Sequence, residues 1–227
     1  MRTPDASGAD SASSGATAAS RVFDALKQDL IRGRFAAGQK LAIGSLKTHY
    51  RVGLSPLREA LNRLAAYGLL EQVNQRGFRV PALRLDELDD IADLRSQLEC
   101  KALTQALQHG DAEWESQLLA AHHRLRRADE RPQEMEECEQ AHLRFHRTLL
   151  APCGSPWLLR FIEQLHDQFD RYRRLAPPDL EVREVLDRQH GELVQLAMAR
   201  RVSQARALLD EHIDLSHGVA RGACSAP

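Results

Sequence analysis

Two histidines four residues apart form the clearest metal-binding pattern in this sequence. His142 and His146 project from one face of a helix, about one turn apart, so their imidazoles can chelate a single ion. His190 and His212 follow on two later helical segments and can complete the site from the opposite side. Four imidazoles suit zinc or nickel better than calcium or magnesium, which prefer oxygen ligands. The spacing alone leaves ordinary core or surface histidines as the alternative.

Residues 51–80 carry the pattern of a DNA-reading helix followed by a β-wing. Ser55 suits the N-cap of that helix and Pro56 its first turn. Leucines at helical spacing predict one buried face and leave Arg58 on another face. Gly68 ends the helix, and two short β-prone segments around a glycine-containing turn predict the wing. The segment therefore predicts a winged helix-turn-helix.

Positive and negative charges are segregated along the chain, although the formal net charge is only −1. Residues 21–84 hold 12 Lys or Arg against 4 Asp or Glu, a net +8, whereas residues 85–227 hold 18 against 26, a net −8. A concentrated positive field suits phosphate binding, because affinity for nucleic acid comes largely from the release of condensed counterions. We therefore expect the first segment to bind DNA and the acidic remainder to avoid it.

Two domains must position these two groups of residues, and 227 residues are enough to bury two cores. Composition predicts a disordered tail over 1–20, the winged helix-turn-helix over 21–80, a linker over 81–86, a helical domain over 87–219 and a tail over 220–227. The predicted fold class is mainly α, with six or seven helices in the second domain. Apolar periodicity, interrupted at Gly- or Pro-containing breaks and at 201–203, places helices near 86–109, 111–128, 133–151, 155–175, 180–199 and 203–217.

Targeting signals and paired cysteines are both missing from the sequence. No apolar run near the N-terminus is long enough for a signal peptide or a membrane span, so we expect a cytoplasmic protein without a membrane partner. The four cysteines lie far apart without a CxxC pair, which favours reduced thiols over a disulfide framework.

Several short motifs follow one another in a definite order. On the DNA side they are LSPLREAL at 54–61 and RGFRV at 76–80, and on the sensor side DLR at 93–95, LE at 98–99, FHR at 145–147, His190 and His212. In this order they resemble the GntR family of bacterial transcription regulators, in its FadR-like branch with a ligand-sensing FCD domain. The resemblance covers roughly residues 22–217. The segment VNQRGF at 73–78 and the segment at 145–159 are most similar to CsiR-like, glutarate-responsive members.

The resemblance implies a divalent ion in the sensor domain. In FCD domains a carboxylate, a histidine one turn later and two further histidines ligate the metal, and His142, His146, His190 and His212 occupy those places. His142 stands where the family usually has Asp, which removes a negative charge and can alter metal choice or leave the position unused. The remaining histidines are expected at the surface, and they include His122, His123, His166 and His217.

The resemblance also assigns Arg95 to the carboxylate of an effector. The planar guanidinium can grip a carboxylate through two hydrogen bonds, from the side opposite the metal. From the residues alone, the alternative is a surface ion pair with Asp93 or Glu99. Tyr172 and Arg173 are further candidates for the effector pocket.

On the DNA side, Arg58 keeps its family position in the first turn of the recognition helix. Its guanidinium can bond guanine O6 and N7 or grip a phosphate. The other expected DNA-binding residues set affinity or backbone shape, and they are Lys47, Ser55, Pro56, Arg76, Gly77 and Arg79. Leu54 and Gly44 stand where family members usually carry basic residues, so operator preference is expected to differ.

The resulting hypothesis is a homodimeric repressor that binds double-stranded operator DNA and is released by a small carboxylate, with glutarate or another dicarboxylate as the first choice. An acid held between Arg95 and the metal would shift the bundle helices, and the linker at 81–86 would change the spacing of the recognition helices. Two alternatives are a metal-independent sensor and a metallohydrolase. HLRFH at 142–146 lacks the zincin glutamate, so we expect no enzyme.

Overall fold

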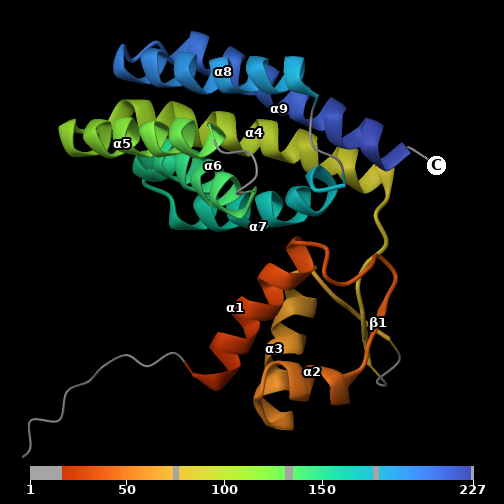
Figure 1. Ribbon diagram of the computed structural model, residues 1–227. Helices are drawn as coiled ribbons and strands as arrows, with labels where there is room; N and C mark the ends of the chain where they lie inside the picture. Colours follow the sequence, from red (N-terminus) through yellow and green to blue (C-terminus); the bar gives the residue numbers. More distant parts are fainter. Residues whose placement is uncertain (1–16, 74–76, 131–134, 176–178, 226–227) are drawn as a thin grey trace, which may run out of the picture.

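The structure, a computed structural model, describes residues 17–73, 77–130, 135–175 and 179–225. These residues form a small winged helix-turn-helix domain and a larger all-helical domain stacked above it (Figure 1). The predicted fold class, mainly α, is confirmed. In these four segments, no helix is long and apolar enough to cross a membrane.

The small domain combines three helices with a three-stranded antiparallel sheet. Its elements are α1 (Ala18–Ile31), β1 (Lys40–Leu41), α2 (Ile43–His49), α3 (Leu54–Ala66), β2 (Glu71–Gln72) and β3 (Phe78–Arg79). β3 lies in the centre of the sheet and pairs with both other strands. β1 was not predicted, because a strand of two residues has no alternation to reveal it and β1, unlike β2 and β3, does not flank the turn of a hairpin.

The predicted recognition helix, α3, begins one residue earlier than its sequence suggests. Gly53 is the N-cap and makes no side-chain cap bond, so the prediction that Ser55 caps this helix is wrong. Ser55 lies instead in the first turn, next to Pro56. Gly68 ends the helix as predicted, with a φ of +84° that a residue without a Cβ adopts without strain.

Both ends of the folded chain extend further than composition indicated. The Thr17 side chain caps α1 by accepting a hydrogen bond from the backbone N–H of Ser20 at 3.1 Å. Residues 17–20 therefore belong to the small domain, whereas residues 1–16 of the expected tail lie outside the described residues. The final helix continues to Ser225, through residues expected to form a C-terminal tail.

The large domain consists of long helices that follow the predicted ranges closely. They are α4 (Leu85–His109), α5 (Ala112–Asp129), α6 (Met135–Leu150), η1 (Ala151–Cys153), α7 (Pro156–Arg173), α8 (Leu180–Met198) and α9 (Val202–Ser225), where η1 is a short 3₁₀ turn. α4 packs against both α7 and α9. Figure 1 shows α6 and α7 on the side facing the small domain and α8 on the opposite side.

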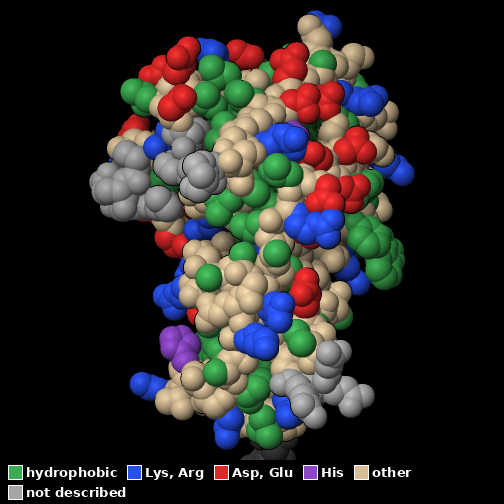
Figure 2. All heavy atoms as spheres, turned by 90° about the vertical axis from the view of Figure 1, so that its right-hand side faces the viewer, with side chains coloured by type: hydrophobic (Ala, Val, Ile, Leu, Met, Phe, Trp, Pro, Cys, Tyr) green, Lys and Arg blue, Asp and Glu red, His purple; other side chains and the backbone are tan. Residues whose placement is uncertain are grey.

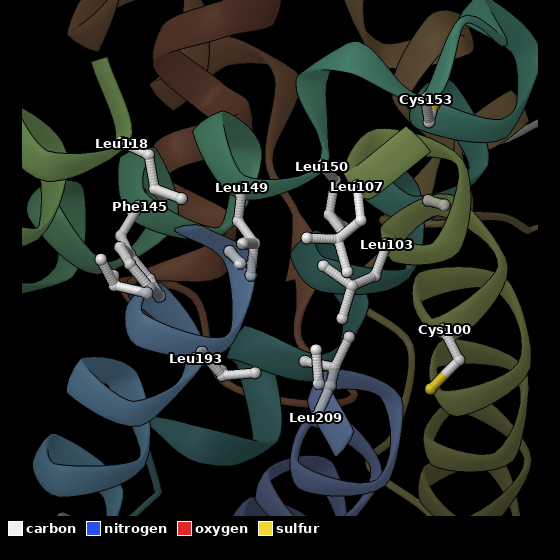
Figure 3. Packing of buried hydrophobic residues seen from close by; sticks show 14 of the residues in the cluster. Cys100, Leu103, Leu107, Leu118, Phe145, Leu149, Leu150, Cys153, Leu193 and Leu209 are labelled. Carbon is white, nitrogen blue, oxygen red and sulfur yellow. The ribbon is translucent and has the colours of Figure 1, made fainter. Parts of the chain in front are cut away.

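Apolar side chains at helical spacing fix these helices to one another. Leu103 of α4, Phe145 of α6, Leu193 of α8 and Leu209 of α9 are all 0% exposed and belong to one cluster (Figure 3). Burial of each such side chain stabilises the fold by about 1.5–3 kcal/mol. The packing holds α6, α8 and α9 in a fixed arrangement, and these helices carry the predicted metal ligands.

The small domain docks on α7 through a buried polar junction. Lys27 Nζ of α1 lies 2.5 Å from Asp167 Oδ2, and the Tyr67 hydroxyl donates a hydrogen bond to the same oxygen at 2.6 Å. The side chains of Lys27 and Asp167 are only 12% and 6% exposed. Arg171 donates from Nη2 to the carbonyl of Pro81, in the linker, at 2.8 Å. α7 is therefore in contact with both the small domain and the linker.

Candidate metal centre and DNA-binding face

Four histidines from three helices meet inside the large domain. His142 and His146 come from α6, His190 from α8 and His212 from α9, and one ring nitrogen of each lies within 4.8 Å of the others. The last three side chains are 1%, 3% and 2% exposed. The Nε2 atoms of His142 and His146 are 3.2 Å apart. The structure thus brings together all four predicted ligands.

Burial keeps these imidazoles neutral. Loss of hydration, followed by repulsion from His212, lowers the pKa of His142 to about 3. Burial next to Arg95 lowers the pKa of His212 to about 4, and burial among the other imidazoles lowers the pKa of His146 and His190 well below the ordinary value. A neutral imidazole offers a lone pair, so the cluster presents four nitrogen donors to an ion.

Unpaired ring nitrogens show that the cluster fits a divalent ion. Both nitrogens of His190 and Nδ1 of His146 are buried without a hydrogen-bond partner among the described residues. Leaving such atoms unpaired costs about 1–3 kcal/mol each. Gln189 Oε1 lies 3.1 Å from Nδ1 of His212 and turns the opposite nitrogen of that ring toward the cluster. Nitrogens around tetrahedral zinc lie about 3.4 Å apart, so ligation needs only a modest contraction.

A buried ion-paired group lies beside the histidines. Glu99 is 0% exposed, accepts a hydrogen bond from Arg95 Nε at 2.8 Å and lies 2.8 Å from His166 Nε2. Burial alone would raise the pKa of Glu99, but Arg95 and His166 lower it to about 2. The prediction of a surface position for His166 is wrong, since it is 7% exposed. Arg95 pairs with Glu99, one of the two partners that the residues left open, but the pair is buried and does not lie at the surface as that alternative assumed.

Two cavities adjoin the histidine cluster. The smaller, about 20 Å³, is lined by Arg95 and has room for about one water molecule. The larger, about 170 Å³, has room for a small organic molecule and opens beside His142, His190 and His212. Arg173 of α7 lines both cavities, and its role in binding an effector stays a prediction.

Arg173 is partly buried, with its side chain 21% exposed, and is already paired. Its Nη1 lies 2.9 Å from Glu139 Oε1 and its Nε 3.0 Å from Asp170 Oδ1. Burial, with repulsion from Arg174 and Arg95, lowers its pKa to about 9. Arg173 therefore contributes a partly buried, ion-paired guanidinium to the wall of the cavity that the histidines also line.

Tyr172 does not belong to the effector pocket, which corrects the prediction. Its hydroxyl donates to Glu87 Oε2 at 2.8 Å and accepts from the backbone N–H of Arg84 at 3.3 Å. The ring is 0% exposed and packs with Leu88 in a separate apolar cluster. Consecutive helical residues face different directions, so the position next to Arg173 directs Tyr172 away from both cavities. Tyr172 instead joins α7 to the start of α4.

The candidate DNA-reading residues lie on the part of the small domain that faces away from the large domain. α2 and the start of α3 are at the lower end of the molecule in Figure 1. Lys47, Ser55 and Arg58 are exposed, and Arg58 forms no ion pair with any residue of the described segments. Figure 2 shows Lys and Arg side chains over the small domain and most Asp and Glu side chains over the large one. The predicted charge segregation is thus a spatial separation.

The wing contacts are described only in part. Arg79 lies in β3, opposite Lys40 of β1 and Glu71 of β2, and is half-buried. Gly77 precedes that strand, whereas Arg76 lies outside the described residues. The contact of Arg79 with a DNA groove or phosphate and the role of Gly77 in the backbone shape of the wing stay predictions.

Comparison with known proteins matches both domains. The model described as "Bacterial regulatory proteins, gntR family" matches residues 18–80, and that of the FCD domain matches residues 90–215. The chain belongs to the GntR family. Over 88% of the chain and 84% of the relative, it is 39% identical to the HTH-type transcriptional regulator BphR of Paraburkholderia xenovorans. It is 36% identical to the HTH-type transcriptional repressor GlaR of Escherichia coli, over 83% of the chain and 89% of that protein.

A solved structure has the same fold. Escherichia coli McbR/YncC covers 91% of this chain and 98% of its own, with a TM-score of 0.81 and 23% sequence identity. The GntR and FCD domains together make the chain a transcriptional regulator and not an enzyme, as predicted. Within this GntR-family chain, sequence reasoning missed His166, although His166, Asp170 and Arg173 share one face of α7 at helical spacing. That periodicity was the signal available for finding it.

Proposed function

We propose that this GntR-family regulator is a homodimeric repressor that holds a divalent ion in its FCD domain and leaves its operator when a small carboxylate binds. The observation that carries the proposal is the cluster of four histidines, three of them buried, beside a cavity of about 170 Å³. Relatives named as transcriptional repressors, GlaR and RspR of Escherichia coli, support repression.

His142, His146, His190 and His212 would hold the ion, which their nitrogen donors suggest is zinc or nickel. A bound divalent ion supplies positive charge and Lewis acidity to an anionic ligand. With His142 in place of the family's usual carboxylate, the site itself supplies no negative charge. An anionic effector therefore suits this cluster.

Two arginines support a carboxylate beside the histidines of the cavity. Arg173 lines the cavity wall directly, and Arg95 lies behind the histidines, held by Glu99. Arg173 would orient the acid by sharing hydrogen bonds now made to Glu139. Arg95, in this proposal, contributes positive potential and rigidity and does not grip the ligand.

α7 offers a route from the cavity to the DNA-binding domain. His166, Asp170 and Arg173 face the histidine cavities, whereas Asp167 and Arg171 hold the small domain and the linker. A displacement of Arg173 by a bound acid would move a helix whose other face is fixed to the DNA reader. This route adds a direct contact to the linker mechanism expected from the sequence.

A second copy of the chain completes the proposal. One recognition helix reads a half-site, and two-fold operators are read by two copies whose helices lie about 34–36 Å apart. If α7 changes the orientation of the small domain, it also changes that separation. The carboxylate would thereby lower the affinity for the whole operator while each half-site contact survives.

The test uses full-length protein purified without chelator and a duplex selected from a random pool. We expect about one divalent ion per chain, a gain in melting temperature on adding zinc, and release of the duplex by a carboxylate that also raises that temperature. His190→Ala should lose the ion and the thermal gain. His123→Ala, an exposed histidine of the same domain, is the matched control and should keep both. If the purified protein contains no metal and zinc does not raise its melting temperature, the metal site is excluded and a metal-independent sensor is the remaining hypothesis.

A further inference from the structure

The cavity beside the histidines has a lining of mixed charge. It combines three of the histidines and Arg173 with the carboxylates of Asp129 and Asp187, which lie close enough to repel each other, and Asp187 is nearly one helical turn before His190 on α8. Resting on the carboxylate sensor proposed above, we propose that Asp129 and Asp187 bind an ammonium group, so that the effector is a short ω-amino acid. Its carboxylate lies toward the histidines and its ammonium toward the two aspartates.

The aspartate pair has more negative than positive charge around it. Arg183 is the guanidinium beside these two acids, and its Nη2 lies 3.8 Å from Asp129 Oδ1, beyond hydrogen-bond distance. Asp187 makes no hydrogen bond or ion pair with a residue of the described segments. Two carboxylates thus share one loosely held cation, which leaves an excess charge of about −1 facing the cavity.

The position of Asp129 in the fold strengthens this negative potential. It is the last residue of α5, where the helix dipole places a partial negative charge. Its side chain is only 19% exposed. Burial and the repulsion of Asp187 raise the pKa of Asp129 to about 6, and burial raises that of Asp187 as well. A ligand cation would relieve this repulsion, because an opposite charge favours the ionised form of both acids.

The length of the ligand follows from α8. Asp187 and His190 are three residues apart on one helix and line the same cavity, so they are separated by about 4.5 Å along the helix axis. A chain of about three methylene groups spans such a distance between a carboxylate and an ammonium. Leu125, Leu186 and Val219 provide the apolar wall that methylene groups need.

The histidines of the same cavity also call for a ligand. His190 is 3% exposed, and neither of its ring nitrogens has a hydrogen-bond partner among the described residues. The cavity therefore joins unpaired imidazole nitrogens, suited to an ion and its bound carboxylate, to two carboxylates that share one loosely held cation. An amino acid satisfies both groups, whereas a dicarboxylate such as glutarate brings a second negative charge against Asp129 and Asp187.

Three acids with the same three-methylene chain test this ligand class. Butanoate, glutarate and 4-aminobutanoate are titrated into the zinc-loaded, full-length protein by calorimetry in a carboxylate-free buffer. We expect 4-aminobutanoate to bind at least about tenfold more tightly than either other acid, as a charge-assisted hydrogen bond to a buried acid implies. 3-Aminopropanoate and 5-aminopentanoate extend the series by one methylene in each direction.

Conservative variants locate the effect. Asp187→Asn and Asp129→Asn should each remove most of the tenfold preference and leave the affinity for butanoate unchanged. Asp93→Asn, which removes an exposed carboxylate from α4, should keep the preference. Circular dichroism and zinc content verify that each variant is folded and loaded.

Two results overturn the inference without touching the carboxylate sensor. One is glutarate or butanoate binding at least as tightly as every amino acid in the series, with release of DNA. The other is an amino-acid preference that persists in both Asp→Asn variants. Failure of all the acids to bind overturns the carboxylate sensor itself, and the ligand class with it.

Discussion

Asp167→Asn should uncouple the sensor from the DNA reader without unfolding either domain. The substitution keeps the size of the side chain and an oxygen that the Tyr67 hydroxyl can still bond. It removes the charge that Lys27 Nζ approaches to 2.5 Å in a junction where the two side chains are 12% and 6% exposed. The two domains have separate hydrophobic cores, so the loss falls on the contact between them.

The expected loss is a few kcal/mol. Breaking a buried ion pair by removing one partner typically costs about 3–5 kcal/mol, because the other charge stays buried. Here Lys27 keeps a second carboxylate, Glu163, at 3.9 Å and lies over the Tyr67 ring at 4.8 Å. We therefore expect about 2–3 kcal/mol, which is enough to let the domains separate for part of the time.

The assay measures operator affinity by fluorescence anisotropy, with and without the acid that releases the wild-type protein. In Asp167→Asn the acid should bind with nearly unchanged affinity by calorimetry, while its effect on operator affinity falls to a small fraction of the wild-type effect. Denaturation should change from one transition to two, since the domains no longer support each other.

Glu163→Gln is the matched control on the same helix. Glu163 is 42% exposed, and surface ion pairs contribute about 0–1 kcal/mol, so this variant should respond like the wild type. A full response in Asp167→Asn, with a single unfolding transition, would refute the role of α7 as the link between the sensor and the reader.

Three further predictions concern the reader, the histidines and the cavity. Arg58→Ala should lower affinity for the selected operator by about 1–3 kcal/mol in anisotropy and leave the metal content unchanged, and an unchanged affinity would remove Arg58 from the interface. The free energy of unfolding of the metal-free protein, measured in urea, should fall as the pH drops below about 6.5. His142 and His212, with pKa values of about 3 and 4, stay neutral in the fold and take up protons on unfolding. A free energy of unfolding that does not change between about pH 7 and 5 would contradict this. Asp129→Asn should raise the free energy of unfolding by about 1–2 kcal/mol at pH 8, since the folded pKa of about 6 makes the ionised acid destabilising above that pH. The gain should shrink as the pH falls below about 6 and be nearly absent by about pH 3, below the ordinary pKa of an aspartate, where the acid is largely protonated in both states; a gain independent of pH would exclude this cause.

Local patterns in the sequence were enough to predict most helices and the histidines that cluster in the fold. The six long helices of the large domain follow the predicted breaks, of which all but the last, at 201–203, contain Gly or Pro, and Gly68 ends α3 because its φ is positive. His142 and His146 share a face because a helix repeats every 3.6 residues. These features depend on neighbours in the chain, so the chain order alone reveals them.

Features that depend on distant residues could not be read in this way. The sequence left two partners open for Arg95. In the structure Arg95 bonds to Glu99, and the packing of α4 against α7 brings His166 to the same carboxylate. Asp129 and Asp187 carry no motif, and they come together only where the end of α5 meets α8. The same holds for Lys27, which is an ordinary surface lysine in its own helix.

The sequence by itself thus determined the family, the class of fold and the set of histidines, because periodicity, turn residues and motif order are local properties. The tertiary structure decided which charges are paired, where the cavity opens and which helix joins sensor to reader. Burial is the physical reason for this division. It changes the pKa and the partner of a charged side chain, and it is set by residues that lie far away along the chain.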